Sequence, residues 1–409
     1  MKLKVSTYIL ENGLKVIINE DPYSTMVASC IVYLVGSRTE REGITGISHV
    51  LEHLMYKGTD RISPEDYSKR IQKIGGYDNA YTSKDYTAFY AYLPVEGLET
   101  FLELEADRMV NLKIRNFEEE MEVIKDERRY TTQDNPVEAF MEEFWLRLFE
   151  KHPYRFPVIG FMEDLEKMTV EKVLEYYNEY YVPSNAILSI SGNVNEGKTL
   201  ELIKKYFSGI NKNGMGSSTL RFEPPQKEKR FFKIKKKRVT PLVVLGFKTV
   251  PLGSELTPVF EVLGEMLCGG KWGVLVSDLV YDKRIFASIQ CDSSHLMEAG
   301  IFSIVGVPSP GRDVIDSYKI LEEKLFGASN KFNEELLVTA RNKILADFYF
   351  NIESVRDVVF DLAEFEMGGG AGLINEYPDV IKRVSMEDVK KAMESYIREE
   401  LLTVGVLYG

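Results

Sequence analysis

Two histidines and a glutamate lie close together in the stretch SHVLEHLMYK, residues 48–57. If this stretch is helical, His49 and His53 lie on one face, one turn apart, and Glu52 lies on the same side. Two imidazoles at this spacing can bind one zinc ion, and a carboxylate beside them can take a proton from water. The order His-x-x-Glu-His is the inverted form of a common zinc motif. The pattern therefore predicts a zinc site with its own general base.

A solvated helix face that carries polar residues is the alternative interpretation. The chain has four histidines in 409 residues, so an accidental match is rare, although short motifs recur in large sets of sequences. A catalytic zinc site also needs a third protein ligand and an open position. The segment 118–133 offers Glu120 and Glu127, two helical turns apart on one face. His152 and His295 are the other candidate ligands, and we interpret both as structural residues.

The elements that must position these residues can be predicted from apolar periodicity. The predicted strands cover residues 31–37, 86–93 and 186–192, and the predicted helices cover residues 64–75, 95–111 and 118–133. The stretch 168–193 also resembles the stretch 384–409, and Thr169 and Ser385 are matching N-cap candidates. The two stretches are about half a chain length apart, which indicates a duplicated unit and not a solenoid. Two related α+β domains are therefore predicted.

The predicted boundary between these domains is a segment rich in glycine, serine, proline and charged residues. This linker covers residues 213–230 and has little apolar periodicity. It separates an N-terminal domain, residues 1–212, from a C-terminal domain, residues 231–409. The first domain contains the zinc motif, and the second lacks it.

Composition and charge restrict the classes of partner. The chain is 44% hydrophobic and 28% charged, as expected of a globular protein, and its net charge of −12 argues against nucleic acid as the main partner. No apolar run reaches the ~20 residues that span a bilayer, and the N-terminus lacks the apolar block of a signal peptide. We therefore expect no membrane partner and a cytoplasmic location. Cys30, Cys268 and Cys291 are odd in number and widely spaced, which predicts reduced thiols.

Several long motifs together resemble one enzyme family, the pitrilysin/insulinase family of inverted-zincin metallopeptidases. The likeness is strongest to its short, processing-peptidase-like branch. It rests on HVLEHLMYKGT, GGYDNAYTSKDYTAFY, EMEVIKDE, HPYRFPVIGFMEDLEKMT and YYVPSNAILSISGNV, which follow one another along the chain in the order typical of the family. The resemblance implies an α+β fold of two homologous domains, each a mainly antiparallel β-sheet flanked by α-helices, of the LuxS/metalloprotease and processing-peptidase type.

The same resemblance implies a role for each site residue. His49, His53 and Glu127 are expected to bind one zinc ion per chain, and Glu52 is expected to act as the general base. Glu120 is expected to support activity without binding the metal. The implied activity is a zinc-dependent endopeptidase that hydrolyses unfolded peptides.

The resemblance also implies where the substrate binds. Asn79, Ala80 and Thr82 correspond to an edge strand to which an extended peptide adds its backbone as one more strand.

One motif departs from the pattern of the family. Many members carry an Arg in the second domain and a Tyr seven residues later, and these contact the substrate and the oxyanion. The corresponding stretch here, LVYDKRIFASI, places Tyr281 and Ser288 at the two positions, and Arg284 is the nearest cation. We therefore expect a dimer in which a homologous partner chain supplies the Arg/Tyr pair, a heterodimer being favoured over a homodimer. The alternative is a non-proteolytic peptide-binding or scaffold subunit of the same fold.

Overall fold

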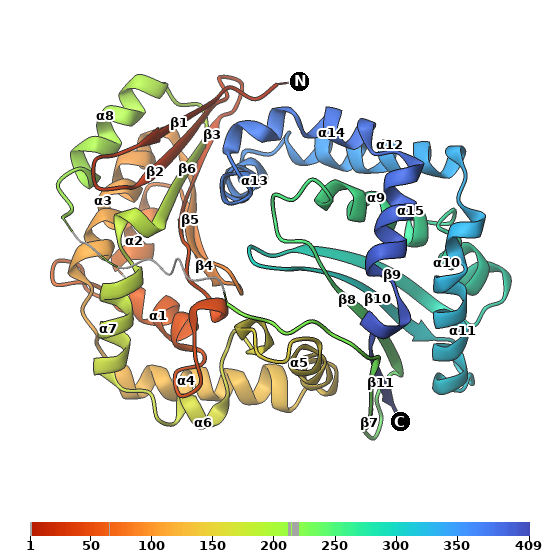
Figure 1. Cartoon of the computed structure of the whole chain (residues 1–409). Coiled ribbons are helices and arrows are strands. Elements are labelled where there is room, and N and C mark those ends of the chain that lie inside the picture. Colours follow the sequence, from red (N-terminus) through yellow and green to blue (C-terminus); the bar gives the residue numbers. More distant parts are fainter. Residues whose placement is uncertain (1, 65, 212–213, 215–220) are drawn as a thin grey trace. The chain divides into compact units, whose positions relative to one another are not determined.

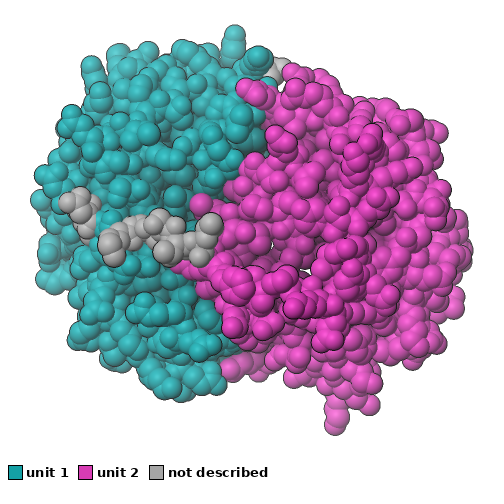
Figure 2. All heavy atoms as spheres, in the orientation of Figure 1, with its two compact units in different colours: residues 1–129, 156–220, 351–375 teal, residues 130–155, 221–350, 376–409 magenta. Residues whose placement is uncertain are grey.

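The computed structural model describes residues 2–64, 66–211, 214 and 221–409. The chain forms two compact units, which are coloured separately in Figure 2. Unit 1 contains Met1–Arg129, Phe156–Leu220 and Asn351–Asn375, and unit 2 contains Tyr130–Arg155, Arg221–Phe350 and Glu376–Gly409. Each unit has one β-sheet with helices packed on it (Figure 1). The α+β class predicted from the sequence is therefore confirmed.

Within the described part of unit 1, the sheet has six strands in the order β1-β2-β6-β3-β5-β4. Neighbouring strands pair antiparallel, except that β2 and β6 are parallel. Strand β4 lies at one edge of this sheet and pairs with β5 on its inner side. The strands are β1 (Val5–Ile9), β2 (Lys15–Glu20), β3 (Met26–Tyr33), β4 (Tyr77–Thr82), β5 (Thr87–Pro94) and β6 (Ala186–Gly192).

Among the residues that the structure describes, the sheet of unit 2 repeats this topology without an equivalent of β1. Its five strands have the order β7-β11-β8-β10-β9, and β7 and β11 form the parallel pair. The strands are β7 (Arg230–Lys235), β8 (Leu242–Thr249), β9 (Phe286–His295), β10 (Gly300–Pro308) and β11 (Thr403–Tyr408). The strand order of this sheet therefore matches that of β2-β6-β3-β5-β4 in unit 1, as the internal sequence similarity predicted.

The helices follow the same repeat. The hydroxyl of Thr169 accepts a hydrogen bond from Lys172 N at the start of α7, and that of Ser385 accepts one from Asp388 N at the start of α15, as predicted for both caps. In sequence order the helices are α1 (Ile47–Met55), α2 (Asp66–Lys73), α3 (Leu98–Asn111), α4 (Phe117–Arg128), α5 (Pro136–Leu148), α6 (Met162–Leu165), α7 (Val170–Tyr180), α8 (Glu196–Phe207), α9 (Thr257–Cys268), α10 (Val274–Val276), α11 (Val314–Phe326), α12 (Glu334–Asn351), α13 (Val355–Met367), α14 (Tyr377–Arg383) and α15 (Met386–Tyr396).

The compact units differ from the predicted domains, residues 1–212 and 231–409, in the placement of two helices. Helix α5 belongs to unit 2 and helix α13 to unit 1. Amphipathic periodicity indicates that a helix packs on a sheet, but it does not tell which sheet. Of the predicted linker 213–230, residue 214 and residues 221–230 lie among the described residues.

Both helices pack on the sheet of their unit, and two glycines let α5 approach closely. Helix α13 packs on β3 and β6. In unit 2, a Cβ atom added to Gly246 would lie 2.5 Å from the ring of Phe144 of α5, and one added to Gly405 would lie 2.7 Å from the ring of Phe140. Larger residues at these glycines would push α5 away from the sheet.

Two sequence predictions were wrong in detail. The strand predicted over residues 31–37 is β3, which begins at Met26 and ends at Tyr33. Cys268 and Cys291 form a disulfide with their Cα atoms 5.6 Å apart, so the prediction of reduced thiols fails for this pair. Helix α9 packs on β9 and brings the two sulfurs together, which their spacing in the sequence does not reveal. Cys30 is a free, buried thiol.

No helix within the described part of the chain is both long and apolar enough to cross a membrane.

Candidate metal centre

Helix α1 presents the predicted site residues on its half-buried face. Its apolar side chains, among them Val50, Leu51 and Leu54, are fully buried in the core of unit 1. His49 and His53 are half-buried. The two imidazole centroids lie 4.7 Å apart, as expected for positions i and i+4 of a helix.

The N-terminus of α1 is held by the buried carboxylate of Glu40. Its two oxygens accept hydrogen bonds from the backbone N–H groups of Gly46 and Ser48, at 2.7 and 3.0 Å. These are donors that the helix itself cannot satisfy, and a carboxylate also interacts favourably with the helix dipole there. Burial raises the pKa of Glu40 to about 7, while its hydrogen bonds to Ser48 and Gly46 act to lower it. This contact fixes the start of the helix at Ile47, two residues before His49.

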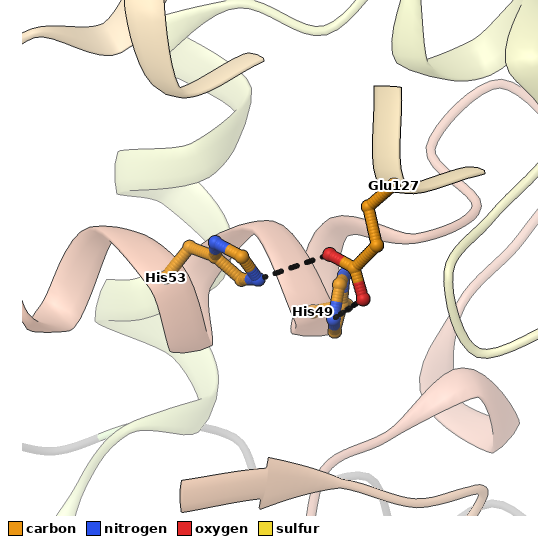
Figure 3. A group of neighbouring side chains, drawn as sticks. All are labelled: His49, His53 and Glu127. Carbon is orange, nitrogen blue, oxygen red and sulfur yellow. Dashed lines mark ion pairs between the residues drawn. The ribbon is translucent and has the colours of Figure 1, made fainter. Parts of the chain in front are cut away.

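Glu127 of α4 faces both histidines of α1 (Figure 3). Its Oε1 lies 3.9 Å from His49 Nε2, and its Oε2 lies 3.5 Å from His53 Nε2. One donor atom from each of the three residues lies within 4.8 Å of the other two. Tetrahedral zinc with ligand bonds of ~2.0–2.2 Å needs its ligand atoms about 3.5 Å apart. The donor set and its spacing therefore fit a zinc ion.

The other candidate ligands lie elsewhere. Among the described residues, only one group of three or more His, Cys, Asp or Glu side chains could hold a metal ion. It consists of His49, His53 and Glu127. His152 Nε2 is hydrogen-bonded to Glu298 at 2.9 Å, and its Nδ1 accepts from the backbone of Tyr154. His295 Nε2 lies 3.3 Å from Glu261 Oε1. Both of these histidines belong to unit 2.

Glu120 holds His53 from the side opposite to Glu127. His53 Nδ1 donates to Glu120 Oε1 at 2.9 Å, and Lys57 Nζ pairs with Glu120 Oε2 at 2.5 Å. A carboxylate on Nδ1 fixes the tautomer and the ring orientation, so that Nε2 points toward Glu127. Sequence reasoning missed Lys57, although its position four residues after His53 on the same helix was the available signal.

Glu52 contacts the edge strand β4. The hydroxyl of Thr82 donates to Glu52 Oε2 at 2.6 Å. Asn79 is exposed on the same strand, and its Oδ1 accepts from the backbone N–H of Ala80. The structure thus places all three predicted substrate-binding residues on an edge strand beside α1. The direct contact between Thr82 and Glu52 was not predicted.

The pKa values of three site residues show where charge resides in the site. Burial and the charge of His53 together lower the pKa of His49 to about 4, although Glu127 opposes the shift. Burial also acts to lower the pKa of His53, but its hydrogen bonds to Glu120 and Glu127 outweigh burial and raise the pKa to about 9. Burial raises the pKa of Glu52, while the hydrogen bond from Thr82 opposes that shift. At neutral pH His53 is therefore protonated on both nitrogens. The proton on Nε2, which faces Glu127, occupies the place that a metal cation would take.

Comparison with protein families identifies the class of protein to which this fold and site belong. Residues 15–159 match the family model described as Insulinase (Peptidase family M16), and residues 167–344 match the model described as Peptidase M16 inactive domain. These matches cover well over half of the chain. The chain belongs to the insulinase family of peptidases, and the resemblance seen in the sequence is confirmed.

Individual relatives support a protease role. The zinc protease PqqE of Helicobacter pylori is 28% identical over 408 residues, which cover 97% of this chain and 91% of the relative. The crystal structure of a protease from Helicobacter pylori has a TM-score of 0.92 and 27% identity, with full coverage of both chains. The periplasmic protease PqqL from Escherichia coli shares the fold, with a TM-score of 0.81 and 17% identity, but this chain covers 47% of its length.

Proposed function

We propose that this chain is a zinc-dependent endopeptidase that hydrolyses unfolded peptides bound as an extended strand along β4. The observation that carries the proposal is the convergence of His49, His53 and Glu127 within 4.8 Å. These three residues would hold one zinc ion per chain. Glu52 lies on α1, the helix that carries both histidines. Its carboxylate is hydrogen-bonded to the edge strand along which a peptide would lie.

Each of the residues around the metal position has a separate task. A bound zinc ion would polarise the scissile carbonyl and increase the acidity of water. Glu52 takes the proton of the attacking water and delivers it to the leaving amine. Burial makes Glu52 a stronger base than a surface glutamate, and Thr82 holds one of its oxygens in place. Glu120 orients His53 through its Nδ1–H.

The edge position of β4 defines the form of the substrate. An edge strand presents backbone N–H and C=O groups that can pair with one further strand. A peptide that adds itself there must be extended, so a folded domain cannot occupy the site until that segment unfolds. In this binding mode Asn79, Ala80 and Thr82 lie beside the substrate backbone.

A homologous partner chain would complete the site. Tyr281 has no positive charge, and the hydroxyl of Ser288 is much shorter than a phenol, so neither can replace the Arg and Tyr that they align with. The match to about half of a longer protease of the same fold supports pairing of two such chains. We propose a heterodimer over a homodimer, because a second copy of this chain brings the same Tyr281 and Ser288.

Metal analysis and peptide cleavage test the proposal. The wild-type chain should hold about one zinc ion, and His49→Ala or Glu127→Gln should abolish both zinc and activity. Glu52→Gln should keep zinc and lose about 10²–10⁴-fold in kcat, because it removes the proton acceptor. Glu122→Gln is the matched control on α4, since Glu122 is an exposed glutamate paired with Lys125.

The same assay separates the alternatives when it is run with and without a co-expressed homologous chain. Full turnover by the lone chain would refute the partner requirement. A zinc-loaded chain that cleaves no unstructured peptide under either condition would refute the peptidase proposal and favour the scaffold subunit.

A further inference from the structure

Strand β4 has a second face, which points away from Glu52. Side chains alternate along a strand, so Tyr77, Asn79 and Tyr81 lie on the face opposite to Thr82. Tyr92 and Tyr90 of β5 are the register partners of Tyr77 and Asn79 and share that face. We call this surface the tyrosine face; it consists of Tyr77, Tyr81, Tyr90 and Tyr92.

Helix α13 contacts three of the four tyrosines of this face and leaves Tyr77 largely exposed. The ring of Phe360 lies 5.8 Å from that of Tyr81 and 5.1 Å from that of Tyr90. The guanidinium of Arg356 lies 4.1 Å from the centre of the Tyr92 ring. Tyr77, in contrast, is 51% exposed. The uncovered part of this face therefore lies at Tyr77 and Asn79, in the first half of the edge strand β4.

The exposed ring of Tyr77 is already oriented by its neighbours. It is parallel to the ring of Tyr92, with an interplanar angle of 5° and 6.1 Å between centroids. Asn79 Nδ2 donates to the Tyr77 hydroxyl at 3.2 Å. An ordered ring loses little conformational entropy when a second apolar group packs on it. The ring of Tyr77 is thus preorganised to pack against a side chain of the substrate.

We propose that Tyr77 selects peptides that carry an aromatic or large apolar side chain at one position remote from the scissile bond. The inference rests on the proposed function, because it needs a peptide paired with β4. A residue of such a peptide directly opposite Tyr77 would have its Cβ about 4.5–5.5 Å away on the same face. Arg356 adds positive charge beneath the stacked pair, so the site favours an uncharged ring over a cation.

The length of β4 sets the distance between this contact and the chemistry. Tyr77 and Thr82 are the two ends of the six-residue strand, and Thr82 contacts Glu52. Their separation along an extended strand is about 17 Å, so the selected side chain lies about five residues from the cleaved bond. The position of the aromatic residue should therefore determine where the peptide is cut.

A series of unstructured peptides with a single Phe in a uniform serine-rich background tests this inference. With the wild-type chain, the cleaved bond should move in step with the Phe at a fixed spacing of about five residues. The Glu52→Gln chain should bind Phe peptides about three- to tenfold more tightly than the all-serine peptide, as expected for one aromatic pair. Tyr77→Ala should abolish both effects, and Tyr77→Phe, which keeps the ring, should retain them. Tyr23→Ala is the control at a 92% exposed tyrosine elsewhere in unit 1.

The two readouts distinguish the failure of this inference from the failure of the proposed function. If the Glu52→Gln chain binds both kinds of peptide equally, or if the preference for Phe survives Tyr77→Ala, the tyrosine face does not select substrates. If binding depends on Phe and on Tyr77 but the wild-type chain cleaves nothing, either alone or with the co-expressed homologous chain, the inference holds and the peptidase proposal is wrong. Unchanged melting temperatures of the Tyr77 variants would show that their fold is intact.

Discussion

At the scale of single residues, His53 has the central place in the candidate site. Its Nδ1 is bonded to Glu120 and its Nε2 faces Glu127. The metal-free chain therefore keeps a proton on this imidazole at a pH where an ordinary histidine has lost it. The proton and the metal ion compete for the same nitrogen.

We predict that zinc binding at pH 7 releases about one proton per ion, because the pKa of His53 is raised to about 9 and that of His49 is lowered to about 4. Calorimetric titration in buffers with different heats of ionisation measures this number. Zinc affinity should rise by up to about tenfold per pH unit between pH 7 and 9. In the Glu120→Gln variant, zinc binding should release fewer protons and should be weaker by about 10- to 100-fold.

The raised pKa of His53 also makes the folding stability of the metal-free chain depend on pH. This stability should fall as the pH rises, whereas the zinc affinity should increase. A raised pKa means that the folded state binds the His53 proton more tightly than the unfolded state does. The resulting stabilisation is fully present below pH 6.5 and is lost as the pH rises through about 9. No proton release at pH 7 would contradict the assignment of a charged His53.

At the scale of elements, the start of α1 depends on a close contact between two glycines. Gly46 has a φ of +85°, and a Cβ atom added to it would lie 2.5 Å from the carbonyl oxygen of Ile159 and 2.9 Å from Gly160 Cα. Asp164, which follows this segment, accepts hydrogen bonds from Gly43 N and from Thr45. The loop before α1 is therefore fixed against the segment around residue 160.

Gly46→Ala should destabilise the fold by about 3 kcal/mol or more, because it adds a backbone clash to the cost of a positive φ. Gly43→Ala is the matched control, since Gly43 has a φ of +91° and open space around its Cβ position. It should cost only about 1–2 kcal/mol. Urea unfolding of both variants measures the difference, and zinc titration should show weaker binding for Gly46→Ala. Equal losses of stability would show that the contact with Gly160 can relax.

At the scale of the whole molecule, each compact unit contains a helix from the other half of the sequence. Helix α13 of unit 1 is anchored by an ion pair between Lys15 and Glu366 at 2.7 Å. Just after it, Asn375 exchanges two hydrogen bonds with the backbone of Leu3. The disulfide Cys268–Cys291 is a second whole-molecule feature, and such bonds are typical of oxidising compartments. The cytoplasmic location stays a prediction.

We predict that a fragment of residues 1–212 is less stable than unit 1 in the full chain. It lacks α13, so buried residues of β3 such as Ala28 and Cys30, on the face away from the main core, would be exposed to water. A lower melting temperature and self-association on size-exclusion chromatography are expected. Addition of residues 351–375 as a peptide should restore stability. A fragment that melts like the full chain on its own would show that α13 is dispensable for unit 1.

Local sequence determined much of this protein. The amphipathic pattern of α1 placed His49, Glu52 and His53 on one face, the N-cap hydroxyls of Thr169 and Ser385 began their helices, and the repeated stretches predicted two matching halves. These features depend on residues within a few turns of one another, so periodicity and spacing are sufficient to predict them.

Only the tertiary structure decided which distant groups meet. It placed Glu127 against both histidines, Glu120 on the far side of His53, and Thr82 on Glu52. It also paired Cys268 with Cys291 and assigned α5 and α13 to units that sequence spacing had not indicated. The physical reason is the same in each case: these contacts depend on how helices pack on sheets, and an apolar stripe specifies that a face is buried without specifying its partner.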